Sequence, residues 1–456
     1  MKNKKRFKVG AKVRIVLATI AGITLVITIA LYAADVPHGS EDQARVYYRG
    51  LATSVGFRDP DTIFTSTLDD VTTYMGYQGL GARDLQRLSS AVLMDPEQLT
   101  SPCTPPTPCA GVENPALLQQ TLAVRPFRTG DILAARFFAP KIININDPPA
   151  TRQLGWRKLI RLRARSGSTA AAHGIDTAII LLNFFTNPGE LPFDPAKESG
   201  NTQVILTSNA PGKDSIYWLD YGKLSKGGTL SFQLDASFDA RDFQPNTTPG
   251  GTSGVQAYHV PDGCVGCHGG ENQHKALVNY LDTDHWFDRL DNDFTGQSIP
   301  VLFDAGTNDT STPQYARAFD AIRQFNEEAE QQARATNPTA FHDAAAKTWL
   351  ALHQNSNRHV PPAERAVPGA VAWSQNDAEV LGLLNQYCFR CHGTIKFNVF
   401  DKAAVQERVS LIRASLRPTP EQLRRDPGIL MPRDRAMKPE DLQRLLDLLP
   451  HTGGHD

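Results

Sequence analysis

The sequence predicts a multidomain α+β protein, in which an antiparallel, sandwich-like β-rich middle region is followed by helical domains. Three observations support this fold class. Short apolar runs bounded by Gly, Pro, Asn and Ser recur at strand-like spacing within residues 131–254. Helical periodicity then takes over, since Phe319 and Phe325 share one stripe of the segment Tyr315–Arg334. Finally, a chain of 456 residues is long enough for two or three buried cores.

The first predicted element is a membrane-spanning helix within residues 1–34. Residues 15–34 form a stretch of twenty positions without a charge, which is long enough to cross a bilayer. Seven Lys and Arg side chains precede this stretch, so its amino-terminal end is expected to stay in the cytoplasm while the body is exported. A cleaved secretory signal is the alternative, but its apolar region is usually shorter, and Leu31 or Tyr32 would make a poor cleavage site. The body is therefore expected on the periplasmic side of a bacterial inner membrane, either anchored there or secreted.

The charge of the exported body excludes one class of partner. After residue 34 the chain holds 40 Lys and Arg against 48 Asp and Glu, a net charge of −8. Nucleic-acid binding requires a basic footprint, so no nucleic-acid partner is expected. The sequence has no fixed repeat and no low-complexity bias, which argues against collagen-like, coiled-coil and disordered classes.

Residues 35–130 are predicted to be mostly helical and irregular, with helical segments at 41–51, after Ser40, and at 82–93. Three prolines separate Cys103 from Cys109, and they favour a tight turn or a polyproline conformation. In an oxidising compartment these two cysteines are expected to form a small disulfide loop. The alternative is two free thiols on an exposed loop.

The β-rich domain is placed at residues 131–254, and its last ten residues read as a linker. Two further helical regions are placed at 255–359 and 360–456. The strand candidates of the middle domain are 156–165, 177–185, 203–206 and 230–234.

Two copies of the pattern C-x-x-C-H carry the chemistry of the chain, one starting at Cys264 and the other at Cys388. Random sequence of this composition would contain only about 0.002 copies of the pattern. Two thiols at this spacing each add to a vinyl group of a porphyrin, and the adjacent imidazole reaches the iron. The pattern therefore predicts two covalently bound haem c groups. The residues that attach them are Cys264, Cys267, Cys388 and Cys391, and the proximal iron ligands are His268 and His392.

Two other interpretations of these cysteines were weighed. Two C-x-x-C pairs are able to form a four-cysteine zinc site, but zinc does not need a histidine after each pair. Two structural disulfides are the other alternative, although such disulfides close very small loops and leave both histidines unexplained. Covalent haem also suits an exported chain better than zinc does.

The region around the second motif, about residues 360–449, resembles a class I c-type cytochrome domain. A predicted helix over Asn376–Tyr387 leads into the motif, and a second helix over Pro439–Leu449 has proline in its first turn. Between them, Met431 stands directly before a proline. The resemblance implies that Met431 is the sixth ligand of the second haem iron and that the last helix crosses the first. Met437 is the local alternative, but it lacks the following proline.

The first haem departs from this pattern because no methionine lies between His268 and Met431. Its sixth ligand is therefore sought among the histidines. His342 ranks first, because it lies at the start of a predicted helix over residues 341–354, roughly where a class I cytochrome domain offers its distal ligand. The histidines considered are His259, His274, His285, His342, His353 and His359.

Two functions follow from two haems in one exported chain. The favoured one is electron transfer between redox partner proteins by a di-haem c-type cytochrome that its amino-terminal helix anchors in the inner membrane. The alternative is a di-haem peroxidase or a related oxygenase, in which the first iron is open to peroxide or dioxygen. The chain departs from the usual peroxidase pattern, because some 230 exported residues precede Cys264.

Overall fold

The structure is a computed structural model, and it describes the chain in segments between residues 40 and 449. These segments are residues 40–88, 92–94, 116–117, 120–121, 130–140, 154–186, 202–210, 214–222, 228–232, 259–261, 264, 268, 278–284, 309–336, 341–360, 377–388, 399, 401–425, 431 and 437–449. The predicted membrane helix at 15–34 and the predicted Cys103–Cys109 loop lie outside them.

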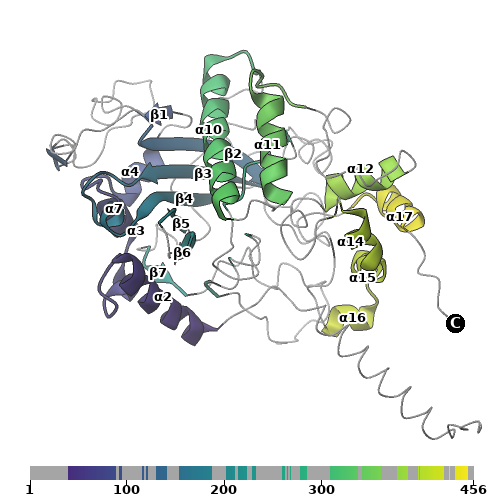
Figure 1. The fold of residues 1–456 in the computed structure, drawn as a ribbon, viewed down its shortest axis with the longest axis horizontal. Helices are drawn as coiled ribbons and strands as arrows, with labels where there is room; N and C mark the ends of the chain where they lie inside the picture. The colour runs from purple at the N-terminus through teal and green to yellow at the C-terminus, as the bar shows by residue number, and fades with distance from the viewer. Residues whose placement is uncertain are drawn as a thin grey trace, which may run out of the picture. The chain divides into compact units, whose positions relative to one another are not determined.

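The described strands form one antiparallel sheet in which every strand pairs with the next one along the chain (Figure 1). The seven strands are β1 (Val92–Met94), β2 (Ile132–Pro140), β3 (Leu154–Arg163), β4 (Ile175–Thr186), β5 (Thr202–Ser208), β6 (Ile216–Tyr221) and β7 (Leu230–Ser231). An antiparallel sheet within a mixed α+β chain is what the sequence predicts. Four of the strands lie where strand candidates were placed, whereas β1, β2 and β6 were not among the candidates.

Helices, and not a second sheet, pack on both faces of this sheet in the described part of the chain, so the sandwich-like arrangement was not found. Neighbouring residues of β4 demonstrate the two-sided cover, because Ile179 and Ile180 point to opposite faces and both are buried. A strand covered on both faces reads as a continuous apolar run. Such a run does not reveal whether its cover is helical or stranded, which is why the sequence did not distinguish the two.

One face of the sheet carries α10 (Pro313–Thr336), which crosses in front of β2 and β3 and lies beside α11 (Phe341–His353) (Figure 1). The predicted apolar stripe of α10 is buried, with Phe319 and Phe325 at most 3% exposed. Phe319 also stacks on Trp349 of α11, with ring centroids 5.6 Å apart. The two helices therefore share an aromatic core.

The opposite face is contacted by α4 (Ala82–Arg87). Lys158 on β3 is fully buried there and donates hydrogen bonds to the carbonyl oxygens of Leu85 and Gln86. A cation at the last turn of a helix satisfies carbonyl groups that have no partner within the helix. The predicted helix at 82–93 is shorter than expected, because Val92–Met94 leaves it to pair with β2. The other short helical elements are η1 (Ile63–Thr65), α3 (Leu68–Tyr74) and α7 (Thr169–Ala172).

The edge of the sheet at β6 is closed by α2 (Glu41–Val55), whose N-cap is Ser40, as the sequence predicts. The hydroxyl of Tyr47 accepts a hydrogen bond of 2.7 Å from the backbone N–H of Trp218. The hydroxyl of Tyr48 accepts one of 3.2 Å from the N–H of Asp220 and donates one of 2.7 Å to the carbonyl of Ser231. Since β7 has only two residues, the two tyrosines satisfy N–H groups of β6 that its neighbour leaves open.

The carboxyl-terminal part forms a separate helical group, which is described here by itself. Its helices are α12 (Ala378–Tyr387), α14 (Lys402–Glu407), α15 (Val409–Leu416), α16 (Pro420–Arg425) and α17 (Pro439–Leu448). Leu384 of α12 and Leu445 of α17 are buried in one apolar cluster. Arg444 and Glu379 join the same two helices at the surface, with distances of 2.5 and 2.7 Å between nitrogen and oxygen. The contact between the first and last predicted helices of this region is therefore present.

Candidate functional site

The register of the sheet places a row of four side chains across one face. Arg161 of β3 lies opposite Ile179, Ile179 lies opposite Ile205, and Ile205 lies opposite Trp218 of β6. Directly opposed residues in antiparallel strands project from the same face. With strands about 4.8 Å apart, Arg161 and Trp218 mark two positions about 14 Å apart on that face.

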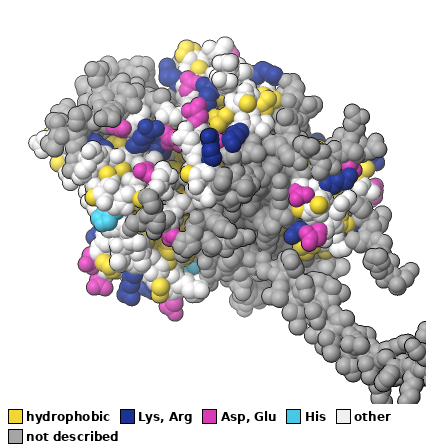
Figure 2. Space-filling model, viewed as in Figure 1, with side chains coloured by type: hydrophobic (Ala, Val, Ile, Leu, Met, Phe, Trp, Pro, Cys, Tyr) yellow, Lys and Arg dark blue, Asp and Glu magenta, His cyan; other side chains and the backbone are white. Residues whose placement is uncertain are grey.

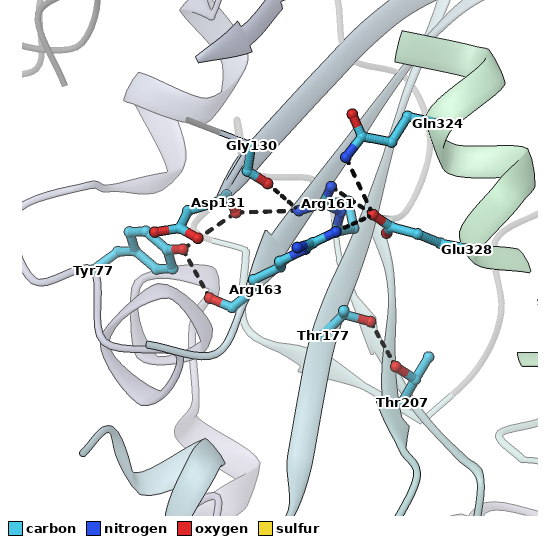
Figure 3. Close-up of polar contacts among 9 residues, drawn as sticks. All are labelled: Tyr77, Gly130, Asp131, Arg161, Arg163, Thr177, Thr207, Gln324 and Glu328. Carbon is cyan, nitrogen blue, oxygen red and sulfur yellow. Dashed lines mark hydrogen bonds and ion pairs between the residues drawn. The ribbon is translucent and has the colours of Figure 1, made fainter. Parts of the chain in front are cut away.

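At the β3 end of this row, the face is joined to α10 by an ion pair (Figure 3). Oε1 of Glu328 accepts hydrogen bonds of 2.8 Å from Arg161 and from Arg163. The Arg161 side chain is fully buried and also donates to the carbonyl of Gly130 at 2.6 Å. Burial lowers the pKa of Arg161 from its usual value, and Glu328 opposes that shift by favouring the charged form.

At the β5–β6 end of the row, the same face carries the first C-x-x-C-H motif. Cys264 is 2% exposed, and the side-chain amide of Gln203 on β5 lies 3.8 Å from its sulfur. Gln203 and Ile205 are two residues apart on β5, so Gln203 projects from the same face as Trp218. The β-rich domain and the first motif therefore form one site, although the sequence predicts them as separate regions.

His268 of the same motif is half-buried and lies beside the ring of Trp218, with centroids 6.2 Å apart and planes tilted by 53°. Trp218 is fully buried, and its indole nitrogen has no hydrogen-bond partner in the structure. A buried donor without an acceptor costs about 1–3 kcal/mol. The ring that contacts His268 thus carries a buried N–H donor without an acceptor.

Nearby tyrosines add neutral polar groups to this site. Burial raises the pKa of Tyr48 well above its usual value, and Asp220 and Cys264 raise it further by charge repulsion. A phenol with a raised pKa keeps its proton at neutral pH. Tyr48 therefore remains a hydrogen-bond donor to Ser231 next to the motif.

The second motif begins where α12 ends. Cys388 is the C-cap of this helix, and its backbone N–H donates a hydrogen bond of 2.9 Å to the carbonyl of Leu384. Its side chain packs against the apolar cluster of the carboxyl-terminal helices. Neither Cys264 nor Cys388 forms a disulfide. Cys267, Cys391 and His392 lie outside the described residues.

Met431, the expected sixth ligand of the second haem, is held near the end of α15 by a hydrogen bond of 2.9 Å from its N–H to the carbonyl of Ser415. Met437, the local alternative, packs against the apolar cluster that contains Leu384 and Leu445. The packing of Met437 favours a structural role for that residue and leaves Met431 as the ligand candidate.

The histidines proposed for the first iron differ in their surroundings. His353 is fully buried, and its two ring nitrogens lie 2.8 Å from Oδ2 of Asp284 and 3.2 Å from the carbonyl of Ser356. Both nitrogens are thus engaged, so His353 is not available to an iron in this conformation. His259 has a buried Nδ1 without a partner.

The remaining candidates are less informative. His342 lies in the first turn of α11, where the sequence places it, and its side chain is outside the described set. His359 is half-buried. His274 and His285 lie outside the described residues.

A cavity of about 540 Å³ lies between the sheet and α10, next to the Arg163–Glu328 pair. Thr177 and Thr207 line it, but their hydroxyls bond to each other at 2.6 Å (Figure 3). Gln332, also in the lining, binds the N–H of Val278 through its side-chain oxygen. Because these polar groups already satisfy one another, the cavity does not by itself indicate a ligand.

The described segments were compared with what a metal site and a membrane span require, and their surface charge is shown in Figure 2. They contain no cluster of three or more His, Cys, Asp or Glu side chains arranged for a metal ion. None of their helices has both the length and the apolar character of a membrane span. On the face seen in Figure 2, acidic and basic side chains are interspersed over the described surface.

Sequence reasoning identified the motif residues but missed Gln203 and Trp218. Trp218 is 50 positions from His268, and nothing local in the sequence links the two. The aromatic composition of Ile216–Tyr221 was the one available signal of a strand there. No protein-family model, curated protein or solved structure was found to match this chain.

Proposed function

We propose that this chain is an exported, membrane-anchored c-type cytochrome that carries two covalent haem c groups and transfers electrons in the periplasm. The observation that carries the proposal is the pair of C-x-x-C-H motifs, at Cys264 and Cys388, downstream of a basic and then apolar amino terminus. Its expected partners are redox proteins, and its expected anchor is the helix at residues 15–34.

The described atoms at both motifs are compatible with attached porphyrins. Cys264 is buried beside Gln203 of β5, and Cys388 is half-buried at the end of α12. Beside His268, the unpartnered indole N–H of Trp218 is a donor for which the carboxylates of a haem would be acceptors. A bound haem supplies one-electron exchange at its iron.

Each protein group has a defined role in this proposal. Thioether bonds from the cysteine pairs would fasten the two porphyrins, and His268 and His392 would bind the irons. Met431 would provide a sulfur ligand to the second iron, and such ligation raises the reduction potential relative to two nitrogen ligands. With a histidine as the sixth ligand of the first iron, the second haem would have the higher potential. The sheet holds the first motif through Gln203 and Trp218.

Counting covalent haem tests the proposal. The full chain, produced in a host that matures c-type cytochromes, should retain two haems per chain after acid–acetone extraction. The double variants C264S/C267S and C388S/C391S should each retain one. C103S/C109S is the matched control, since it removes a cysteine pair that is not followed by histidine, and it should retain two. A colourless protein with bound zinc would overturn the proposal.

Carbon monoxide separates the carrier from the peroxidase-like alternative. An electron carrier with both irons six-coordinate should show no prompt change in its ferrous spectrum when carbon monoxide is added without oxygen. Prompt binding at one haem would contradict the carrier function and favour the peroxidase or oxygenase. C264S/C267S then identifies the open iron, because the signal should disappear with the first haem.

Cell fractionation tests the anchor. The full chain should remain with the inner membrane and be sensitive to protease added from the periplasmic side. A chain whose first 34 residues are exchanged for a cleavable signal should appear in the soluble periplasm with both haems attached. Recovery of the full-length product in the cytoplasm, without haem, would contradict export.

A further inference from the structure

We propose that Trp218 binds the first haem, by donating a hydrogen bond from its indole nitrogen to a propionate carboxylate while its ring packs against His268. This inference rests on the proposed function, since it requires a haem at Cys264. It assigns the β-rich domain a task, namely to provide one wall of the first haem site.

Trp218 lies beside the first C-x-x-C-H motif. Its ring lies 6.2 Å from that of His268, centroid to centroid, and Gln203 on the adjacent strand lies 3.8 Å from the sulfur of Cys264. Two side chains of one sheet face thus contact two residues of the motif. A porphyrin fastened at Cys264 and bound through His268 therefore begins at this face.

The indole nitrogen of Trp218 lacks an acceptor. Tryptophan is a donor only, and a buried donor without a partner costs about 1–3 kcal/mol. Trp218 is fully buried, and its indole N–H has no acceptor among the protein groups. Haem c brings two propionate carboxylates to the site, and hydrogen bonds to ionised acceptors are stronger than those to neutral ones.

Backbone contacts of β6 fix the position of Trp218. Its backbone pairs with Ile205 of β5, and its own N–H donates to the hydroxyl of Tyr47 at 2.7 Å. All six residues of β6 are buried. A donor held in this way pays little conformational entropy when it binds, so the site is preorganised for the cofactor.

The matched control comes from the chain itself. Trp349 on α11 is also buried, at 4% exposure, and its indole nitrogen is also without a partner. It packs on Phe319 and His353 within the α10–α11 pair. W349F therefore removes the same kind of group at a place where the described contacts involve neither motif.

The test measures the reduction potential of each haem by spectroelectrochemistry on the full chain. A hydrogen bond to a propionate withdraws negative charge and favours the ferrous iron. W218F keeps an aromatic ring but removes the donor. The equilibrium between ferrous and ferric iron in the first haem should therefore shift about tenfold toward the ferric form, which lowers its reduction potential by about 59 mV for one electron. The second haem should not shift. W349F should leave both potentials unchanged.

Three outcomes separate the inference from the function it rests on. Two haems with unchanged potentials in W218F would overturn the role of Trp218 and leave the cytochrome standing. Absence of covalent haem in the unsubstituted chain would overturn the proposed function itself. If W218F does not accumulate, NMR of the unsubstituted chain decides: the Trp218 indole proton should shift with the iron oxidation state far more than that of Trp349, and equal shifts would refute the bond.

Discussion

Arg161 and Glu328 form an ion pair in which the arginine side chain is fully buried and the carboxylate is 23% exposed. Because Arg163 shares the same carboxylate oxygen, two cations depend on one acid. The ion pairs of Glu328 with these two arginines join α10 to the face of the sheet that also carries the first motif. The strength of this connection can be measured.

Substitution E328Q should destabilise the fold by about 3 kcal/mol, since it leaves a buried guanidinium without a counter-charge. Urea unfolding followed by circular dichroism measures the change. D320N on the same helix is the control, because Asp320 is exposed and pairs with Arg323 at the surface. That variant should cost less than about 1 kcal/mol. Equal costs for the two variants would mean that the buried pair does not hold α10.

The two methionines of the carboxyl-terminal region should respond differently to substitution. M431L should remove the sulfur–iron absorption band of the second haem and lower its potential, because a thioether ligand favours the ferrous iron. M437L should keep both properties, since Met437 packs in the apolar cluster and leucine preserves much of its volume. Visible spectra and potentiometry provide the measurement. If the band persists in M431L and vanishes in M437L, Met437 is the ligand and Met431 is not.

His353 should prove structural. Its hydrogen bonds to Asp284 and Ser356 connect α11 to the segment 278–284, and Asp284 also accepts the N–H of Val360 at 2.9 Å. H353Q should lower the unfolding free energy by about 2 kcal/mol or more, as expected for loss of a buried charge-assisted hydrogen bond. The spectra of both haems should stay as they are. The exposed His173 supplies a control, H173Q, with an effect below about 0.5 kcal/mol. Conversion of the first haem to a five-coordinate spectrum in H353Q would make His353 an iron ligand after all.

The buried tyrosines should make the fold sensitive to alkali. Burial raises the pKa of Tyr48, Tyr77 and Tyr221 above the usual value of about 10. Below that pH the phenols are neutral in the folded and the unfolded chain, so their contribution to the free energy of unfolding is fully present. Above it only the phenols of the unfolded chain ionise, and the free energy of unfolding falls as pH rises.

Tyrosinate absorbance from these residues should therefore appear in one step together with the loss of circular dichroism. In Y77F the absorbance change in that step should be smaller by the contribution of one tyrosinate. Smooth ionisation with a midpoint near pH 10 and an intact fold would show that these phenols are accessible to solvent.

Elements with strong local periodicity were predicted well from the sequence. The helix expected at Tyr315–Arg334 is found at Pro313–Thr336, and the one expected at Asn376–Tyr387 is found at Ala378–Tyr387. Both have an apolar stripe that neighbours bury, so the local signal and the tertiary packing agree. Cysteine spacing likewise needs no tertiary information.

Features that depend on long-range contacts were not predictable. The helix expected beyond Arg87 is replaced by β1, because pairing with Ala134 and its neighbours on β2 outweighs helix propensity. The contact between Trp218 and His268 arises only when the sheet has formed. Whether helices or strands cover a two-sided apolar strand such as β4 is also decided by segments far away in the chain.

The pairing of every strand with its sequence neighbour has a consequence for biogenesis. A meander needs no late-arriving segment to complete it, so β1 to β7 are free to assemble progressively as the polypeptide is delivered from its amino-terminal end. Cys264 follows all of these strands. In the proposed cytochrome, the first haem would thus be attached to thiols beside a sheet that has already folded.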